Sequence, residues 1–335
     1  MKLIEIAFVG TGKFLPKKII SAKDLDQKFN KKIGWFEKKS GVKQRHFADA
    51  DETTSQMAVN AAFDAIADAK INIKDLDCII SAATGVEQAI PNTSSLIQKK
   101  LGLENSAIAT FDINSTCLSF FSALDVAAPM IEVGKYKNIL IVSSEIPSLS
   151  LNWNDTETCS IFGDGAAAAI ISKPQKNNQN HCQILASNFE TYSRGFEFCQ
   201  IKSGGTKLHP NQAPIDYAKY AFFEMNGKAT YRIMTEIIDD FLARLFSKTN
   251  LKLSDIDLVI PHQASRMALN YLRKRLDVKS EKLIDIFATH GNQVAASIPS
   301  ALHQAFKNNK IKKNDKILII GTSAGISIAA MILQF

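Results

Sequence analysis

The stretch Ile71-Asn-Ile-Lys-Asp-Leu-Asp-Cys-Ile-Ile80 is matched position by position by Leu251-Lys-Leu-Ser-Asp-Ile-Asp-Leu-Val-Ile260. Both stretches end in an apolar run typical of a buried strand. Both also follow a segment with helical periodicity, over 53–69 in one case and 229–245 in the other. A long match of this kind within one chain indicates an internal duplication. We therefore predict that the chain consists of two related halves.

The duplication divides the chain into residues 1–172 and residues 173–335. Within each half, apolar strands alternate with helical patterns, and each half closes with a hydrophobic strand, at 166–172 and 326–333. Such alternation predicts an α/β fold with mixed sheets that are covered by helices on both faces. Residues 173–228 are predicted to be an insertion, either a lid or binding loop or a plain surface excursion.

The composition is that of an ordinary globular protein, with 335 residues of which 46% are hydrophobic and 22% are charged. The formal net charge is +7, but the basic residues are scattered and no basic stripe is interleaved with aromatic residues. Nucleic-acid binding is therefore not expected. A mildly basic surface suits an acidic partner or a phosphorylated ligand better.

The five cysteines are odd in number, and none of their spacings is typical of a metal site or of a disulfide framework. This pattern favours a reducing, cytoplasmic environment, and we predict no metal site. The first residues lack the apolar segment of a signal peptide. Residues 317–335 carry no charge, but Gly321-Thr-Ser-Ala-Gly325 interrupts them. We therefore expect two short buried strands around a turn and not a membrane span.

Three polar residues lie where an apolar run ends and a helical pattern begins: Cys117, His262 and Asn292. Because 111–124 and 287–302 are equivalent under the duplication, as strand, junction and helix, the junctions of Cys117 and Asn292 should meet. The positive end of a helix stabilises a thiolate. A histidine and an asparagine can donate hydrogen bonds to a developing oxyanion. The combination predicts thioester chemistry, with Cys117 as the nucleophile.

Structural interpretations of these residues remain open at this point. Cys117 could be a small buried residue at a helix start, His262 a hydrogen-bonded core histidine, and Asn292 a helix cap. Cys159 is a second candidate nucleophile because it precedes a Gly-Asp-Gly motif. Its place within an apolar pattern favours an inert buried thiol.

Several motifs together resemble those of the type III β-ketoacyl-acyl-carrier-protein synthases of the thiolase superfamily. Their order and spacing cover nearly the whole chain, and they comprise Trp35-Phe-Glu-Lys-Lys-Ser-Gly-Val-Lys-Gln-Arg45, the Cys117 junction, Ile161-Phe-Gly-Asp-Gly-Ala166, Met225-Asn-Gly, Pro261-His-Gln-Ala and His290-Gly-Asn292. The resemblance implies a thiolase-like fold, in which the duplicated halves form a five-layer αβαβα sandwich, and a homodimer.

The resemblance also implies a catalytic Cys-His-Asn set at Cys117, His262 and Asn292. Cys117 would take an acyl group from a thioester in a ping-pong scheme. His262 and Asn292 would then stabilise the enolate that forms when a malonyl thioester loses carbon dioxide. The substrates would be thioesters of coenzyme A and of acyl carrier protein, with no other cofactor.

The family's substrate-binding positions correspond to five further residues. Trp35 and Lys39 fall where the family contacts the nucleotide end of coenzyme A, and Asn226 and Gly227 fall beside the pantetheine tunnel. Ser265 stands where the family has an asparagine. Lys39 stands where the family usually has arginine, so it keeps the charge but loses bidentate geometry.

Further positions concern the oxyanion and the partner subunit. A backbone N–H near Ser323, in the loop that ends at Gly325, would hold the acyl oxyanion. An arginine of the family is replaced by Thr156, and the C-terminal glycine run is interrupted in this loop. Glu87 lies in the loop with which the family completes the partner's acyl pocket. It could be a base there or an exposed loop glutamate.

These departures leave three hypotheses. The first is a decarboxylative condensing enzyme that uses malonyl on acyl carrier protein. The second is a non-decarboxylative condensation or an acyl transfer on the same scaffold, as in branches of specialised metabolism. The third is a catalytically silent scaffold subunit, against which the intact Cys-His-Asn set argues.

Overall fold

The computed structural model describes residues 4–175, 180–212 and 214–335. Its central element is a nine-stranded sheet with the strand order β11-β12-β13-β8-β1-β7-β6-β4-β5. The first half supplies β1 (Ile4–Phe14), β4 (Cys78–Ala82), β5 (Ala109–Ile113), β6 (Asn138–Glu145) and β7 (Gly165–Ser172). The second half supplies β8 (His181–Thr191), β11 (Leu258–Pro261), β12 (Lys316–Ser323) and β13 (Ser327–Gln334).

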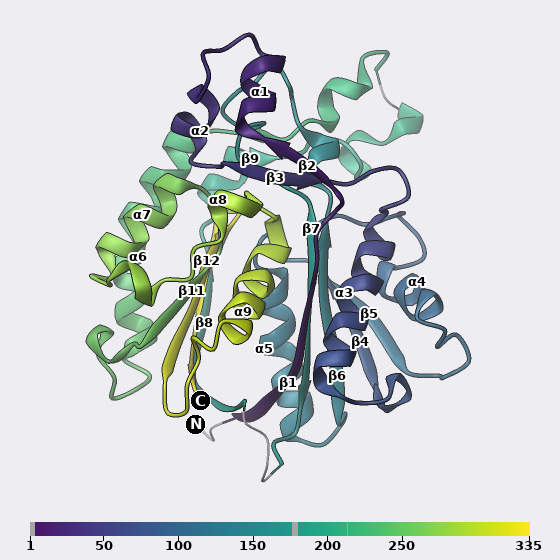
Figure 1. Ribbon diagram of the computed structural model, residues 1–335, viewed down its shortest axis with the longest axis vertical. Helices are drawn as coiled ribbons and strands as arrows, with labels where there is room; N and C mark the ends of the chain where they lie inside the picture. Colours follow the sequence, from purple (N-terminus) through teal and green to yellow (C-terminus); the bar gives the residue numbers. More distant parts are fainter. Residues whose placement is uncertain (1–3, 176–179, 213) are drawn as a thin grey trace.

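The sheet is continuous because β1 pairs with both halves. Residues 4–7 of β1 pair with β8, while residues 7–14 pair with β7. The parallel pairs β4–β5, β4–β6 and β11–β12 are combined with antiparallel pairs, so the sheet is mixed as predicted. The strands of the two halves nevertheless form two separate layers (Figure 1).

Helices α5 (Ser119–Glu132) and α9 (Ser297–Lys307) fill the space between the two layers of strands (Figure 1). Their buried side chains pack against Ile80 and Ile141 on one side and against Ile260 and Ile319 on the other. Because side chains alternate along a strand, the neighbouring residues of each strand face outward to the outer helices.

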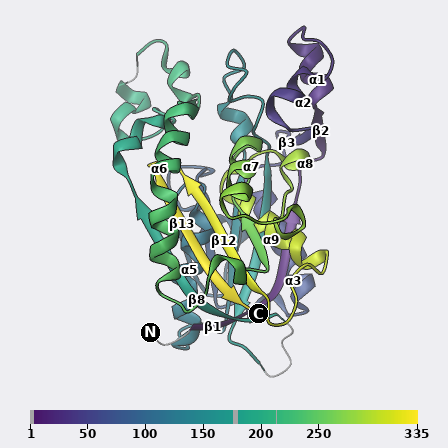
Figure 2. The same cartoon turned by 90° about the vertical axis from the view of Figure 1, so that its left-hand side faces the viewer.

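The outer face of the first layer packs against α3 (Thr54–Ala69) and α4 (Thr93–Lys100). The outer face of the second layer packs against α6 (Gly227–Phe246) and α7 (Arg266–Arg275). Figure 2 shows these last two helices in front of β12 and β13. The result is the five-layer αβαβα sandwich that the resemblance implied.

Smaller elements extend beyond the ends of the strands, at the top of Figure 1. They include β2 (Lys18–Ser21), α1 (Ala22–Lys28), α2 (Trp35–Ser40) and β3 (Gln44–Phe47). The two strands pair with each other in a separate small sheet. A second small sheet joins β9 (Cys199–Gln200) and β10 (Glu224–Met225).

The structure corrects two expectations about these elements. The predicted insertion at 173–228 is too long, because β8 lies within it and pairs with β1 and β13 in the middle of the main sheet. The strand expected before Asn292 is absent, because 287–290 form the short helix α8 (Phe287–His290). The two strands predicted within 317–335 are confirmed as β12 and β13. No helix in the described ranges is long and apolar enough to cross a membrane.

The contact between β1 and α3 depends on two glycines. A Cβ on Gly12 would lie 2.1 Å from the carbonyl oxygen of Ala61, and a Cβ on Gly10 would lie 2.3 Å from that of Ala65. Backbone atoms of a packed helix cannot move aside without cost. The small residues therefore let the helix lie directly on the strand.

We expect Gly12→Ala to lower the free energy of unfolding by about 1–3 kcal/mol, since the added methyl group overpacks this contact. Gly205→Ala is the matched control, because no atom lies within 4 Å of the Cβ it would add. Urea denaturation of both variants would test this. Equal stability of the two variants would contradict the close packing of β1 on α3.

Candidate active site

Cys117 lies in the turn between β5 and α5. Ser119 holds this turn: its hydroxyl accepts the N–H of Ser115 at 3.0 Å and donates to the carbonyl of Thr116 at 2.6 Å. Thr116 has a positive φ of 51°, which is uncommon for a residue with a branched side chain. The turn thus places Cys117 directly before Leu118, the N-cap residue of α5.

His262 follows β11, and its backbone N–H donates to the carbonyl of Ile320 on β12 at 2.9 Å. Asn292 follows α8 and reaches toward the same loop. Its Nδ2 donates to the carbonyl of Ala264 at 3.2 Å, and its Oδ1 accepts the N–H of Val294 at 2.8 Å. The Asn292 amide thus ties its own junction to the His262 junction.

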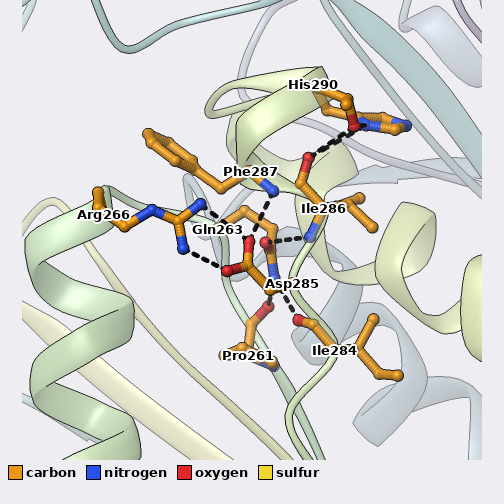
Figure 3. A network of polar contacts seen from close by, with 9 residues as sticks. Pro261, Gln263, Arg266, Ile284, Asp285, Ile286, Phe287 and His290 are labelled. Atoms are coloured by element: carbon orange, nitrogen blue, oxygen red, sulfur yellow. Dashed lines mark hydrogen bonds and ion pairs between the residues drawn. The ribbon is translucent and has the colours of Figure 1, made fainter. Parts of the chain in front are cut away.

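A buried glutamine fixes the two junctions further (Figure 3). Gln263 Nε2 donates to the carbonyls of Pro261 at 2.9 Å and Ile284 at 3.1 Å, and its Oε1 accepts the N–H of Ile286 at 3.0 Å. The side chain is completely buried. Beside it, the Arg266 guanidinium forms an ion pair with Asp285. Gln263 therefore sets the distance between the segments that carry His262 and Asn292.

We expect Gln263→Leu to lower the free energy of unfolding by about 1–3 kcal/mol, because buried backbone groups lose their partners. Turnover should fall as well, since the two junctions lose their fixed spacing. The control is Gln304→Leu, which removes a single exposed hydrogen bond to Asn308. Thermal unfolding and steady-state kinetics would check this, and an unaffected Gln263→Leu would show that the network does not position the site.

Cys117, His262 and Asn292 line one cavity of about 660 Å³, a size in the usual range for small-molecule sites. The three junctions, distant in the sequence, therefore open into a common space. The wall also includes Ser265, Gly227 and, among its mainly apolar residues, Ile161, Phe162, Phe223, Met234 and Leu269. His262 and Asn292 are both buried.

The expectation of a stabilised thiolate is not met in the resting site. Burial, with smaller contributions from the charges of Glu145 and Cys199, raises the pKa of Cys117 to about 12. The backbone N–H groups of Cys117 and Ala324 lower this pKa but do not offset the loss of water. The thiol is thus protonated at neutral pH and must lose its proton as it attacks.

The imidazole of His262 is the neutral group available to accept that proton. Burial lowers the pKa of His262 to about 4, so the ring carries no charge at neutral pH. Its Nδ1 is buried and makes no hydrogen bond within the described part of the chain. A neutral imidazole has one donor and one acceptor nitrogen, so the same ring can donate a hydrogen bond to a carbonyl oxygen.

The predicted oxyanion loop is the turn between β12 and β13. The prediction named Ser323 as the closest position, but the backbone N–H that acts on the Cys117 sulfur belongs to Ala324. The Ser323 hydroxyl donates to the carbonyl of Ala324 at 3.2 Å. Gly325 has φ +132°, where a side chain is rarely tolerated. Within the predicted loop, the N–H at the sulfur therefore belongs to the residue after Ser323.

Two of the five predicted substrate-binding residues line the cavity, and the other three do not. Lys39 Nζ donates to Thr156 Oγ1 at 2.9 Å and lies 4.9 Å from the centre of the Trp35 ring, outside the cavity wall. Gly227 and Ser265 line the cavity. Asn226 caps α6 by accepting the N–H of Ala229 at 3.1 Å, and Ser265 caps α7 in the same manner.

Glu87 does not have the surroundings of a base. Its carboxylate accepts the N–H of Ser55 at 2.7 Å, at the start of α3. Burial raises its pKa, but hydrogen bonds from Ser55 and Thr53 and the charge of Lys100 outweigh this, and the net pKa is lowered. A carboxylate stabilised in this manner is a weaker proton acceptor. Within its own chain, Glu87 instead accepts a hydrogen bond from the N-terminus of α3.

The sequence analysis missed Glu145, the last residue of β6. This carboxylate lines the cavity with Cys117 and is only 3% exposed. It accepts the N–H groups of Thr84 at 2.6 Å and Gly85 at 3.1 Å. Burial raises its pKa to about 7. The available signal was a charged residue at the carboxyl end of a strand that is otherwise uncharged.

The sequence profile described as 3-oxoacyl-[acyl-carrier-protein (ACP)] synthase III matches residues 111–193, and the profile of its C-terminal part matches residues 246–335. A curated β-ketoacyl-[acyl-carrier-protein] synthase III of Caldanaerobacter subterraneus subsp. tengcongensis is 31% identical over 332 residues, covering 99% of this chain and 98% of the relative. The chain belongs to the 3-oxoacyl-[acyl-carrier-protein] synthase III family. It is accordingly an enzyme of the acyltransferase type that condenses acyl units.

Other members of the synthase III family agree with this assignment. The Clostridioides difficile synthase III is 30% identical over 327 residues, covering 98% of this chain and 97% of the relative. The crystal structure of the Aquifex aeolicus synthase III has a TM-score of 0.86 at 30% identity, covering 98% and 100% of the two chains. Xanthomonas campestris OleA shares the fold, with a TM-score of 0.87 at 19% identity over the whole of both chains.

Proposed function

We propose that this synthase III homologue takes an acyl group from a thioester onto Cys117 and condenses it with a malonyl thioester, with loss of carbon dioxide. The proposal rests on one observation above all. Cys117, His262 and Asn292 come from three separate junctions and line a single cavity. A nucleophile and two uncharged hydrogen-bond donors suit this chemistry, because decarboxylation generates the carbanion without a strong base.

In the first half-reaction, the Cys117 sulfur attacks the thioester carbonyl. The thiol proton passes to neutral His262 and from there to the departing thiolate of the carrier. The backbone N–H groups of Cys117 and Ala324 lie at the sulfur, so they are suited to stabilise the oxyanion of the tetrahedral intermediate. The products are S-acyl-Cys117 and a free carrier thiol.

In the second half-reaction, a malonyl thioester enters the cavity. His262 and the second N–H of the Asn292 amide donate to its thioester oxygen as the carboxylate leaves as carbon dioxide. Asn292 Nδ2 already donates one hydrogen to Ala264, and an amide nitrogen has two. The enolate carbon then attacks the acyl group on Cys117, and a β-ketoacyl thioester is released.

The carriers and the assembly are part of the same proposal. The names of the relatives and the net charge of +7 favour acyl carrier protein as an acidic partner. The Trp35–Lys39 cluster suits the nucleotide end of coenzyme A. Val86 and Ile90, 58% and 85% exposed in the loop that follows β4, support a homodimer that covers this loop. We propose a cytoplasmic enzyme that needs no resident cofactor.

Intact-protein mass spectrometry tests this function. The protein would be exposed to a panel of acyl thioesters on coenzyme A and on acyl carrier protein, and then to malonyl-acyl-carrier-protein. We expect a single acyl adduct, which malonyl removes with release of carbon dioxide. An adduct removed without carbon dioxide would instead indicate acyl transfer or non-decarboxylative condensation. No adduct with any thioester would support a catalytically silent subunit.

A further inference from the structure

Glu145 is a carboxyl group without a charged partner in the wall of the active-site cavity. Within the described ranges it forms no ion pair, and the groups at its carboxylate are the uncharged backbone N–H groups of Thr84, Gly85 and Ala295. These donors come from the segment after β4 and from the approach to α9. Burial favours the protonated form of this carboxyl, and the hydrogen bonds from its donors oppose that effect only in part.

The titratable residues that share the cavity wall with Glu145 are Cys117, Cys199, Tyr231, His262 and Tyr271. The charge of Glu145 is the largest contribution after burial to the raised pKa of the Cys117 thiol. His262 lines the same cavity, but burial alone accounts for its lowered pKa. The Thr116 hydroxyl also lines this wall and makes no hydrogen bond in the described part of the chain. Glu145, Cys117 and the Thr116 hydroxyl are therefore polar groups in the wall of a mainly apolar cavity.

The proposed condensation consumes one proton in each turnover. The malonyl carboxylate leaves as carbon dioxide, the enolate carbon forms a bond to the acyl carbon, and the bond from that carbon to the Cys117 sulfur breaks. The electron pair of the broken bond stays on sulfur, so the enzyme is left with a thiolate. In this site the thiolate is strongly basic, and a strongly basic thiolate is a poor leaving group.

We propose that Glu145, in its protonated form, supplies the proton that Cys117 takes up as the β-ketoacyl product leaves. This inference rests on the proposed function and adds a residue to it. The proton moves from the carboxyl to the sulfur within the cavity that both residues line. The carboxylate that remains regains a proton from water that enters the cavity after product release.

The role requires a defined pH dependence. Because burial places the pKa of Glu145 near 7 instead of its ordinary 4.5, the proton donor is present below about pH 7 and is lost as the pH rises through that value. The condensation rate should therefore fall above neutrality. Acylation of Cys117 needs no net proton, so its rate should not show this fall.

The test is single-turnover condensation of preformed S-acyl enzyme with malonyl-acyl-carrier-protein, from pH 5.5 to 9, for wild type and Glu145→Gln. We expect the variant to condense about 100-fold more slowly, as for loss of a general acid, and without the fall near neutrality. Acyl-enzyme formation should be retained. Glu145→Asp should restore a titrating profile. Glu52→Gln is the matched control, since Glu52 is also buried but lies outside the cavity wall.

Two results would overturn the inference while leaving the proposed function intact. One is a Glu145→Gln enzyme that forms S-acyl-Cys117 and condenses with the wild-type rate and pH profile. The other is a wild-type condensation rate that does not fall between pH 6 and 8.5, which decides the matter even if Glu145→Gln does not fold. Failure of wild type to form an acyl enzyme or to release carbon dioxide would instead count against the proposed function.

Discussion

Cys117→Ala is expected to abolish the acyl adduct and to reduce turnover by a factor on the order of 10⁵–10⁶, the scale seen when a covalent nucleophile is removed. The loss should be this large because the Cys117 sulfur has the backbone N–H groups of Cys117 and Ala324 beside it. Cys199 also lines the cavity, but in the described part of the chain only the Thr230 hydroxyl lies at its sulfur. The fold should remain, since alanine is small and the turn is held by Ser119. Intact mass and steady-state turnover would measure the effect.

Cys182→Ala is the matched control for this substitution. Cys182 is also buried, in β8, but lies outside the cavity wall. Burial raises the pKa of its thiol strongly, so it is inert, and the variant should still form the adduct. If Cys117→Ala acquired the same adduct as wild type, another residue would be the nucleophile, and the mechanism proposed above would be wrong.

Asn292→Ala is expected to separate the two half-reactions. We predict a decrease of about 10²–10³-fold in condensation, the cost of one oxyanion donor, while S-acyl-Cys117 still forms at a comparable rate. The acyl adduct should therefore accumulate in the presence of malonyl-acyl-carrier-protein. Time-resolved intact mass, with carbon dioxide release measured in parallel, would show this accumulation.

The control for Asn292→Ala must account for the structural bonds of this amide, which ties its junction to Ala264 and Val294. Asn72→Ala removes a comparable side-chain cap, that of the short helix 73–75, far along the chain from the three junctions. It should match wild type in both half-reactions. An Asn292→Ala enzyme that condenses at the wild-type rate would contradict the role of Asn292 as a donor.

Much of the architecture could be predicted from the internal duplication, because the pattern of apolar residues repeats where strands and helices repeat. The final strands of both halves and the helices before β4 and β11 lie where the pattern placed them. β8 was missed because its sequence alternates polar and apolar residues and lies beside a polar loop, although it forms the middle of the sheet. The prediction of a strand before Asn292 was wrong, because Phe287–His290 forms the short helix α8.

Part of the site could be predicted from the sequence, because equivalent segments of the two halves should bring their strand-to-helix junctions together. That argument brought Cys117 and Asn292 together, and the position of His262 at the end of an apolar run identified it as the third residue. The ionisation of the site could not be obtained in this way, because it depends on burial. The helix start favoured a thiolate at Cys117, but removal of water outweighs it. Glu145 and the Ala324 N–H emerge only when three segments are placed around one cavity.

The most direct test of the central claim is a single turnover that starts from purified S-acyl-Cys117. The acyl enzyme would be freed of excess thioester and mixed with malonyl-acyl-carrier-protein carrying a labelled carboxyl group. Our account predicts one carbon dioxide and one β-ketoacyl-acyl-carrier-protein for each acyl group lost from Cys117. Loss of the acyl group as free acid, or without labelled carbon dioxide, would contradict it.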